Sequence, residues 1–413
     1  MPTGDIADDS LLRLSIRDSW FVESPARVLN HRPFRHTLPG GDRVEVRSEV
    51  NGDEFMVILA REWPGPGGSY PGWAQGSWVL SRRRDTGAAV RIRIFLRSNF
   101  NTYVQFRPLD ADRSQMDVVI YDAYMIHALP IPLAFDRLLV LPVEDVLGTA
   151  DAKFPRRYFD PDAGAYEDIR NFIAGVRKRL PELTFRDDGA IDEEGRYVYI
   201  NDLSYQEGTV GLNCSGFAKW IVDGILRPVT GTRLPISPLK QPFGERGSSF
   251  TEPYEALRDP FFGLDWTRNL ASQAASRLRS SGLGTLEEIE VQKSPFASVI
   301  IRERGGTSIR SYPSFLPNAG FGFEGIQPLL YTLAIDEPGR LYLASINNEL
   351  DPAPRMRQHF HIAVLVPYFN QYGIFQVAVF ESAGETSFRA FRNRYPGHYI
   401  NLVRIPVEGP FDP

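Results

Sequence analysis

The stretch Gly211-Leu212-Asn213-Cys214-Ser215-Gly216-Phe217 holds the single cysteine of the 413-residue chain. Apolar residues then recur at steps of three and four, which predicts a helix with one buried face: Phe217, Trp220, Ile221 and Ile225. Cys214 would begin this helix, where unpaired N–H groups and the positive dipole end favour thiolate over thiol. Ser215 and Gly216 are small enough to let a substrate backbone approach the sulfur. A cysteine that only fills a core needs no such turn, so we predict that Cys214 is a nucleophile.

The residues Asn213 to Phe217 resemble the nucleophile motif of the NlpC family of cell-wall cysteine peptidases, a branch of the papain-like clan. That family usually has aspartate where this chain has Asn213, and asparagine is also a good helix cap. The resemblance implies an α+β fold in which the helix bearing Cys214 packs on an antiparallel sheet. It also implies a substrate-binding tyrosine upstream. Tyr205, in Tyr205-Gln206-Glu207-Gly208, is the candidate, and an ordinary turn tyrosine is the alternative.

The rest of the resemblance lies far downstream. Pro338 to Leu343 resembles the start of the family's sheet, with Arg340 in place of aspartate, and Gln358 to Val366 resembles its histidine-bearing strand. A turn containing Asn370 and Gly373 and the apolar run Phe375 to Ser382 predict a returning strand. Ile400 to Val407 resembles the family's last strand.

This hairpin selects the partners of Cys214. A turn centred on Gln371 sets His361 opposite Glu381, and opposed side chains share a face about 5 Å apart. The carboxylate could then orient the imidazole and stabilise its charge. His359 shares that face by the two-residue period, but it lies opposite Ala383, which cannot orient anything. We therefore choose Cys214, His361 and Glu381 as the catalytic residues, with glutamate where the family usually has histidine.

Residues 1–150 read as a β-rich region. Short apolar stretches separated by Gly, Pro and Asn predict strands, and they are followed by further runs at Val90–Leu96, Met116–Tyr121 and Arg137–Val143. The segment Asp53 to Leu80, with its Gly72-Trp73 turn, resembles the end of a bacterial SH3-like repeat. Such a region would bind the substrate or the cell wall; an unrelated β module is the alternative.

Residues 151–413 are the expected catalytic domain. An amphipathic helix from Ile169 to Leu180 ends at Pro181, because proline cannot continue it. The interval at about 227–325 is longer than the family needs between cysteine and histidine, so we regard it as an insertion. It contains a predicted helix at Trp266–Leu278, and it could form a wall or lid over the site or serve as structural padding.

Composition narrows the possible partners. A formal charge of −5 and a pI near 5.8 give no electrostatic case for nucleic acid. No apolar run approaches the ~20 residues that span a bilayer. One cysteine cannot form an intrachain disulfide or a Cys-rich zinc site, and we expect no metal and no cofactor. Asp5, Asp8 and Asp9 do not fit a secretory signal. The compartment stays open: periplasmic or extracellular if a leader was removed, otherwise cytoplasmic.

The resemblance thus implies a bacterial thiol hydrolase that cuts peptidoglycan stem peptides near the bond from D-glutamate to the diamino acid, acting as a monomer on peptidoglycan or muropeptides. Three alternatives stay open. An acyl transferase of the same clan would use the same residues. A non-catalytic wall-binding scaffold would need none of them. An intracellular amidase would act on recycled wall peptides.

Overall fold

The chain is α+β in the computed structural model, and it divides into two compact units. The N-terminal unit is Met1–Asp160 with Pro295–Tyr312, and the C-terminal unit is Pro161–Ser294 with Pro313–Pro413. The structure describes residues 9–413 except 64, 66, 67, 151, 152, 245–258, 280, 281, 304, 305 and 351–355. Part of the stretch expected as an insertion in the catalytic domain, Pro295–Tyr312, therefore belongs to the N-terminal unit.

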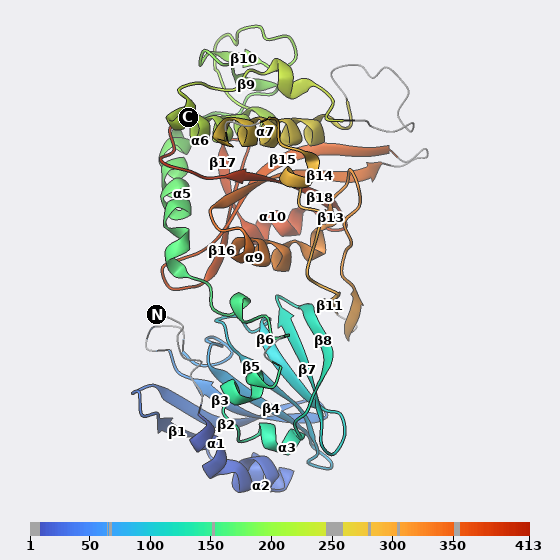
Figure 1. Ribbon diagram of the computed structural model, residues 1–413. Coiled ribbons are helices and arrows are strands. Elements are labelled where there is room, and N and C mark those ends of the chain that lie inside the picture. The colour runs from blue at the N-terminus through green and yellow to red at the C-terminus, as the bar shows by residue number, and fades with distance from the viewer. Residues whose placement is uncertain are drawn as a thin grey trace. The chain divides into compact units, whose positions relative to one another are not determined.

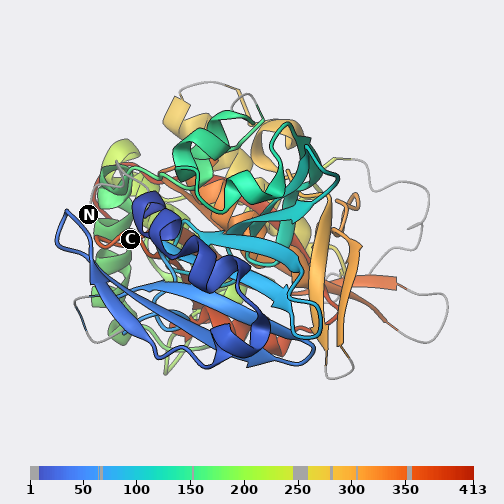
Figure 2. The ribbon, with the colours of Figure 1, turned by 90° about the horizontal axis from the view of Figure 1, so that it is seen from below.

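The N-terminal unit is built on one antiparallel sheet of ten strands in the order β1-β2-β3-β4-β5-β6-β7-β8-β11-β12. Figure 2 shows its dark-blue helices lying across the blue strands, and the orange β11–β12 hairpin extending the sheet beside the blue-green ones. The strands are β1 (Phe34–Thr37), β2 (Arg43–Asn51), β3 (Glu54–Arg61), β4 (Ser77–Arg83), β5 (Ala89–Phe95), β6 (Tyr103–Pro108), β7 (Ser114–Ile120), β8 (Ala123–Ile131), β11 (Ser298–Glu303) and β12 (Gly306–Ser311). The helices are α1 (Ser10–Ile16), a π-helical turn (Arg17–Val22), α2 (Pro25–Leu29), α3 (Phe135–Leu138), α4 (Val143–Gly148) and a 3₁₀ turn (Arg156–Tyr158).

Most of the predicted strands of this unit are confirmed, but the one at Arg137–Val143 is wrong. These residues form the end of α3 and the start of α4. The buried side chains Phe135, Leu138 and Leu139 recur at the three- and four-residue steps of a helix. Pro142 then separates the two helical segments. A continuous apolar run does not distinguish a buried strand from a buried helix, which is why the prediction failed.

The C-terminal unit contains a six-stranded antiparallel sheet in the order β13-β18-β14-β15-β16-β17 and a small β10-β9 hairpin. Its strands are β9 (Gly189–Ile191), β10 (Tyr197–Tyr199), β13 (Phe321–Gly322), β14 (Arg340–Leu350), β15 (Met356–Phe369), β16 (Phe375–Glu381), β17 (Gly384–Ser387) and β18 (Tyr399–Pro406). Its helices are α5 (Glu167–Arg179), α6 (Cys214–Thr230), α7 (Phe262–Arg279), α8 (Leu286–Ile289), α9 (Ile326–Asp336) and α10 (Phe388–Arg394), with 3₁₀ turns at Ala163–Tyr166, Leu180–Glu182, Ser237–Lys240 and Phe323–Gly325.

Helices cover both faces of the six-stranded sheet. In Figure 1, α6 and α7 lie side by side above it, and α9 and α10 lie beneath it. Because α6 is covered all round, its polar residues need partners: Lys219 donates to the Ile191 carbonyl at 2.8 Å and lies 2.6 Å from Asp223. This buried pair ties α6 to β9. None of the helices within the described residues is both long and apolar enough to cross a membrane.

Candidate active site

Cys214 is the first residue of α6. The Asn213 Oδ1 atom accepts a hydrogen bond from the Gly216 N–H at 2.8 Å, and the Asn213 N–H donates to the Gly189 carbonyl at 2.9 Å. This cap gives one N–H of the first turn a hydrogen-bond partner. The Cys214 N–H also belongs to the first turn and has no carbonyl acceptor within the helix. The thiol therefore lies at the positive end of a 17-residue helix.

Ser215 and Gly216 fix the first turn of α6. A Cβ atom on Gly216 would lie 2.0 Å from the Gly189 carbonyl oxygen, so only glycine fits where α6 meets β9. The Ser215 carbonyl accepts a hydrogen bond from Trp266 Nε1 on α7 at 2.9 Å. Both residues are buried. The structure gives them a packing role, and their contact with substrate stays a prediction.

The loop that leads to Cys214 is held by Gln206, which the sequence did not single out. Its Oε1 atom accepts from the Gly211 N–H at 2.8 Å, and its Nε2 atom donates to the carbonyls of Gly211 at 3.0 Å and Val198 at 2.8 Å. The side chain thus bridges β10 and the residues just ahead of the nucleophile. A single glutamine in a loop carries no pattern that could have revealed this role.

Tyr205, the predicted substrate-binding residue, is 59 % exposed. The Arg196 guanidinium lies over its ring, 5.0 Å from the centroid. Among the described residues, no hydrogen bond or ring contact joins Tyr205 to Cys214, His361 or Glu381. The structure therefore does not bring Tyr205 into the same cluster as the three predicted catalytic residues, and its contact with substrate stays a prediction.

A β-bulge decides which histidine of β15 reaches the thiol. Ile346 on β14 lies opposite His361, whereas its neighbour Asn347 lies opposite His359, so Phe360 is the extra residue. Neighbouring residues of β14 point to opposite faces, and opposed residues share a face. His361 and His359 therefore point to opposite faces of the sheet. The prediction that they share a face is wrong because the bulge breaks the two-residue period.

Glu381, the last residue of β16, meets His361 as predicted, but in a different register. Its Oε2 atom lies 2.7 Å from His361 Nε2. The strands pair Phe369 with Phe375 and Val364 with Phe380, so the hairpin is centred on Tyr372 rather than Gln371. Continuing that pairing would put Glu381 opposite Ala363. The shift moves each partner by two residues, which keeps it on the same face, and the long glutamate side chain reaches His361 diagonally.

The Cys214 sulfur lies beside β15, just beyond the point where β15 stops pairing with β16. The β15–β16 pairing ends at Val364 and Phe380, and the backbone of Ile362, just beyond that point, helps to lower the pKa of the Cys214 thiol. The His361 imidazole also acts on this thiol: it lowers the pKa of Cys214, and Cys214 raises the pKa of His361. Because His361 Nε2 is engaged by Glu381, Nδ1 is the ring nitrogen available to the thiol.

The contacts of this group favour a thiolate beside an imidazolium. Burial raises the pKa of the Cys214 thiol, but the hydrogen bond and charge of His361 outweigh it, so the pKa lies below its ordinary value. Burial alone would lower the pKa of His361, yet its bonds to Cys214 and Glu381 raise it to about 9. Burial raises the pKa of Glu381, and its bonds to His361 and Arg394 bring it below the ordinary value. Both shifts favour a thiolate–imidazolium pair, with the Glu381 carboxylate beside it.

Two further residues at the end of α10 contact the set. The Arg394 Nη2 atom lies 2.5 Å from Glu381 Oε1. The Tyr395 ring stacks on His361 with centroids 6.1 Å apart and also contacts Phe360. We define Cys214, His361, Glu381 and Arg394 as the Cys214 site. Arg394 and Tyr395 were not predicted from the sequence, because no catalytic motif marks the end of α10.

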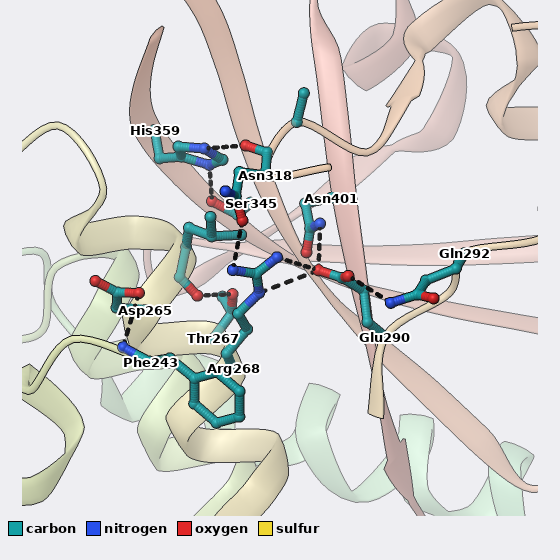
Figure 3. Close-up of polar contacts among 12 residues, drawn as sticks. Phe243, Asp265, Thr267, Arg268, Glu290, Gln292, Asn318, Ser345, His359 and Asn401 are labelled. Carbon is teal, nitrogen blue, oxygen red and sulfur yellow. Dashed lines mark hydrogen bonds and ion pairs between the residues drawn. The ribbon is translucent and has the colours of Figure 1, made fainter. Parts of the chain in front are cut away.

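His359 belongs to a separate buried group, which Figure 3 draws in close-up. Its Nε2 atom lies 3.0 Å from the Asn318 carbonyl oxygen and must donate, so Nδ1 accepts from the Ser345 hydroxyl at 2.8 Å. Burial lowers the pKa of His359 to about 3, only partly offset by the Asn318 bond. His359 is therefore a neutral histidine with both nitrogens occupied, and it is not placed to act on Cys214.

The same group contains a buried ion pair. Arg268 on α7 donates to Glu290 Oε1 through Nη2 at 2.6 Å and through Nε at 3.0 Å, and its Nη1 donates to Asn318 Oδ1 at 2.9 Å. Asn401 Nδ2 also donates to Glu290 Oε1, at 2.7 Å (Figure 3). We call the following residues the Arg268 cluster: Arg268, Glu290, Asn318, Ser345, His359 and Asn401. It joins α7 to strands β14, β15 and β18.

Within the described ranges, no three or more His, Cys, Asp or Glu side chains are grouped so that they could hold a metal ion. Residues 2–158 match a family model described as a domain of unknown function (DUF8515). No curated protein matches the chain, and no solved structure does. The family match lies wholly within the N-terminal unit, so the Cys214 site must be understood from its own geometry.

Proposed function

We propose that the C-terminal unit is a papain-like cysteine amidase of the NlpC type, which hydrolyses peptidoglycan stem peptides near the bond from D-glutamate to the diamino acid. One observation carries the proposal: Cys214 begins a helix and is electrostatically coupled to His361, whose Nε2 atom lies 2.7 Å from Glu381 Oε2. This arrangement supplies a nucleophile, a general acid–base and a residue that orients it. The substrate is taken from the resemblance around Asn213 to Phe217.

The reaction follows from the charges of the resting site. The Cys214 thiolate attacks the amide carbonyl carbon, and the Cys214 N–H donates to the oxyanion that forms. The His361 imidazolium then protonates the leaving amine as the carbon–nitrogen bond breaks, which leaves a thioester on Cys214. Neutral His361 next takes a proton from water, whose oxygen attacks the thioester. Release of the acid restores the ion pair.

Glu381 supports this cycle without exchanging protons with substrate. Its carboxylate accepts a hydrogen bond from His361 Nε2–H, fixes the ring so that Nδ1 faces the sulfur, and stabilises the imidazolium. We expect its loss to cost less than the loss of Cys214 or His361.

For the N-terminal unit we propose binding of the same wall peptides. The segment that resembles an SH3-like repeat contributes β3 and β4. The connection between them carries two stacked indoles, Trp63 and Trp73, with centroids 4.1 Å apart. We propose that the protein acts as a monomer: Cys214, His361 and Glu381 all lie in the C-terminal unit, so the reaction requires no second copy of the chain.

The test compares the wild-type protein with Cys214→Ser on purified peptidoglycan fragments and on free stem tripeptides and tetrapeptides, with mass spectrometry of the products. Cleavage by the wild type alone would support the amidase and identify the bond. Cleavage of the free peptides only would favour a role in recycling. New conjugates on adding an amine or alcohol acceptor would instead favour an acyl transferase.

Failure is equally informative. If no substrate is cut but Cys214 alkylates fast at neutral pH, another amide or a transfer reaction must be sought. If no substrate is cut and Cys214 alkylates no faster than a free cysteine, the catalytic proposal is lost and a wall-binding scaffold replaces it.

A further inference from the structure

We infer that Arg394 is a positioning residue of the Cys214 site, which holds the Glu381 carboxylate so that one oxygen stays on His361. The inference rests on the proposed function, because it assigns a role within that site. The two carboxylate oxygens are divided between two partners: Oε2 lies 2.7 Å from His361 Nε2, and Oε1 lies 2.5 Å from Arg394 Nη2. Because the two partners hold different oxygens, a rotation of the carboxylate that breaks one bond also breaks the other.

Glu381 needs such a restraint because of where it lies. It is the last residue of β16, and its regular partner position on β15 is two residues away from His361. A glutamate side chain has several rotatable bonds, so fixing it in one conformation costs entropy. A diagonal contact through such a chain is easily lost unless the far end is held. Arg394 supplies the hold from the opposite side of the carboxylate.

Arg394 is itself fixed by the surrounding chain. Its guanidinium carbon lies over the Tyr395 ring at 5.5 Å, and its Nη2 atom is 3.5 Å from the Thr386 hydroxyl on β17. Tyr395 in turn stacks on His361. The arginine, the carboxylate, the imidazole and the tyrosine thus form a closed ring of contacts between α10 and the β15–β16 hairpin.

A contribution to folding stability does not explain why Arg394 contacts Glu381. Its side chain is 45 % exposed, and ion pairs of exposed arginines contribute little to folding because water screens them and holding the side chain costs entropy. Its carboxylate partner, by contrast, is only 8 % exposed and makes its other bond to the proposed general acid–base. The arrangement therefore serves the orientation of the carboxylate more than the free energy of the fold.

The charged and titratable groups around His361 determine whether its pKa rises or falls when Arg394 is replaced. They are Cys214 from α6, Glu381 from β16, and Arg394 and Tyr395 at the end of α10. If Arg394 acted on His361 only as a nearby positive charge, its removal would raise the pKa of His361. If Arg394 acts by positioning Glu381, its removal loosens the carboxylate and lowers that pKa. The two roles predict opposite shifts.

The experiment is an NMR titration of the imidazole Cε1–H signals in histidine-labelled full-length protein. The chain has six histidines, and His361→Gln assigns the one that matters. We expect Arg394→Gln to move the His361 titration to lower pH by about one unit. Arg394→Lys, which keeps a charged donor, should restore most of the loss. Arg389→Gln removes one exposed arginine from the same helix and should leave the titration unchanged.

An unchanged or higher His361 pKa in Arg394→Gln would overturn the inference, as would an equal shift in Arg389→Gln. The titration needs no substrate, so it separates this inference from the proposed reaction. If the wild-type titration behaves as expected while wall peptides are not cut, the substrate is wrong and the role of Arg394 stands.

Discussion

The Cys214 site and the Arg268 cluster contain the same three kinds of charged or titratable side chain, used in opposite ways. Each has a histidine of β15, a buried glutamate and an arginine. In the Cys214 site the glutamate touches the histidine directly, and the arginine takes the other oxygen. In the Arg268 cluster the glutamate is bonded to the arginine, and Asn318 stands between the arginine and the histidine.

These different hydrogen-bond partners give very different pKa values to two histidines that are only two positions apart in the sequence. Direct contact with a carboxylate and a thiol raises the pKa of His361 to about 9. Burial against a hydroxyl and a carbonyl lowers the pKa of His359 to about 3, and the nearby Arg268 charge acts in the same direction. The lesson is that the bulge at Phe360, rather than the sequence position, decides which histidine can serve as an acid–base.

The largest effect should come from neutralising the glutamate of each group. Glu290→Gln leaves the Arg268 charge, which is 4 % exposed, without a carboxylate, and we expect a loss of about 3–5 kcal/mol in the free energy of unfolding. Glu381→Gln leaves a half-exposed arginine and an imidazole that can lose its proton, so we expect a smaller loss than for Glu290→Gln. Urea denaturation of both variants measures the contrast. Equal losses in the two would mean that the groups do not differ in the way their burial suggests.

The second prediction concerns how each histidine affects the reactivity of Cys214. Without its imidazolium partner, Cys214 becomes an ordinary thiol that is only a few per cent ionised at neutral pH, so His361→Gln should slow alkylation about 30-fold. His359→Gln should alter that rate less than about twofold, while it destabilises the fold by about 1–3 kcal/mol because Ser345 and Asn318 lose a buried partner. The measurements are alkylation kinetics at pH 7 and urea denaturation. A slow His359→Gln variant with intact stability would contradict the assignment.

His359 and His361 should also differ in how they affect the stability of the protein at acidic pH. The pKa of His359 in the folded protein, about 3, lies below its ordinary value of 6.5. Its contribution to stability is therefore fully present above pH 6.5 and is lost as the pH falls toward 3. His361, with its raised pKa, is already protonated throughout that window. We expect His359→Gln to flatten the fall in unfolding free energy between pH 6.5 and 4, and His361→Gln to leave the His359 contribution in place. Parallel curves for wild type and His359→Gln would show that His359 does not bury its neutral form.

Much of the candidate site could be predicted because it depends on local periodicity. The apolar steps after Cys214 and the capping residue Asn213 placed the thiol at a helix start, and the alternation of β15 and β16 placed His361 and Glu381 on one face. The centre of the hairpin was wrong by one residue, yet a shift of two in the pairing preserved the face. The predicted pair therefore survived an incorrect register.

What could not be predicted depends on contacts between distant segments. The bulge at Phe360 is a departure from regular pairing that no residue type marks. Arg394 and Gln206 act through bonds to residues that the chain alone does not show to be near. The return of Pro295–Tyr312 to the N-terminal unit is likewise a property of the whole fold. Such features leave no period in the sequence, so pattern analysis has nothing to detect.

The smallest expected effect concerns the turn that ends at the catalytic carboxylate. Glu381 pairs with Gly384, and the two residues between them, Ser382 and Ala383, have positive φ values of 48° and 65°. Two-residue hairpins require this left-handed backbone, but a Cβ makes it unfavourable, and glycine is the preferred second residue. Glu290, by contrast, directly follows the helix α8. Ala383→Gly should therefore raise the unfolding free energy by about 0.5 kcal/mol, since relief of strain exceeds the entropy that glycine adds to the unfolded chain. If the strained alanine also helps to orient Glu381, the same change should lower the His361 pKa in the NMR titration. A more stable variant with an unaltered titration would mean that Arg394, and not the turn, orients the carboxylate.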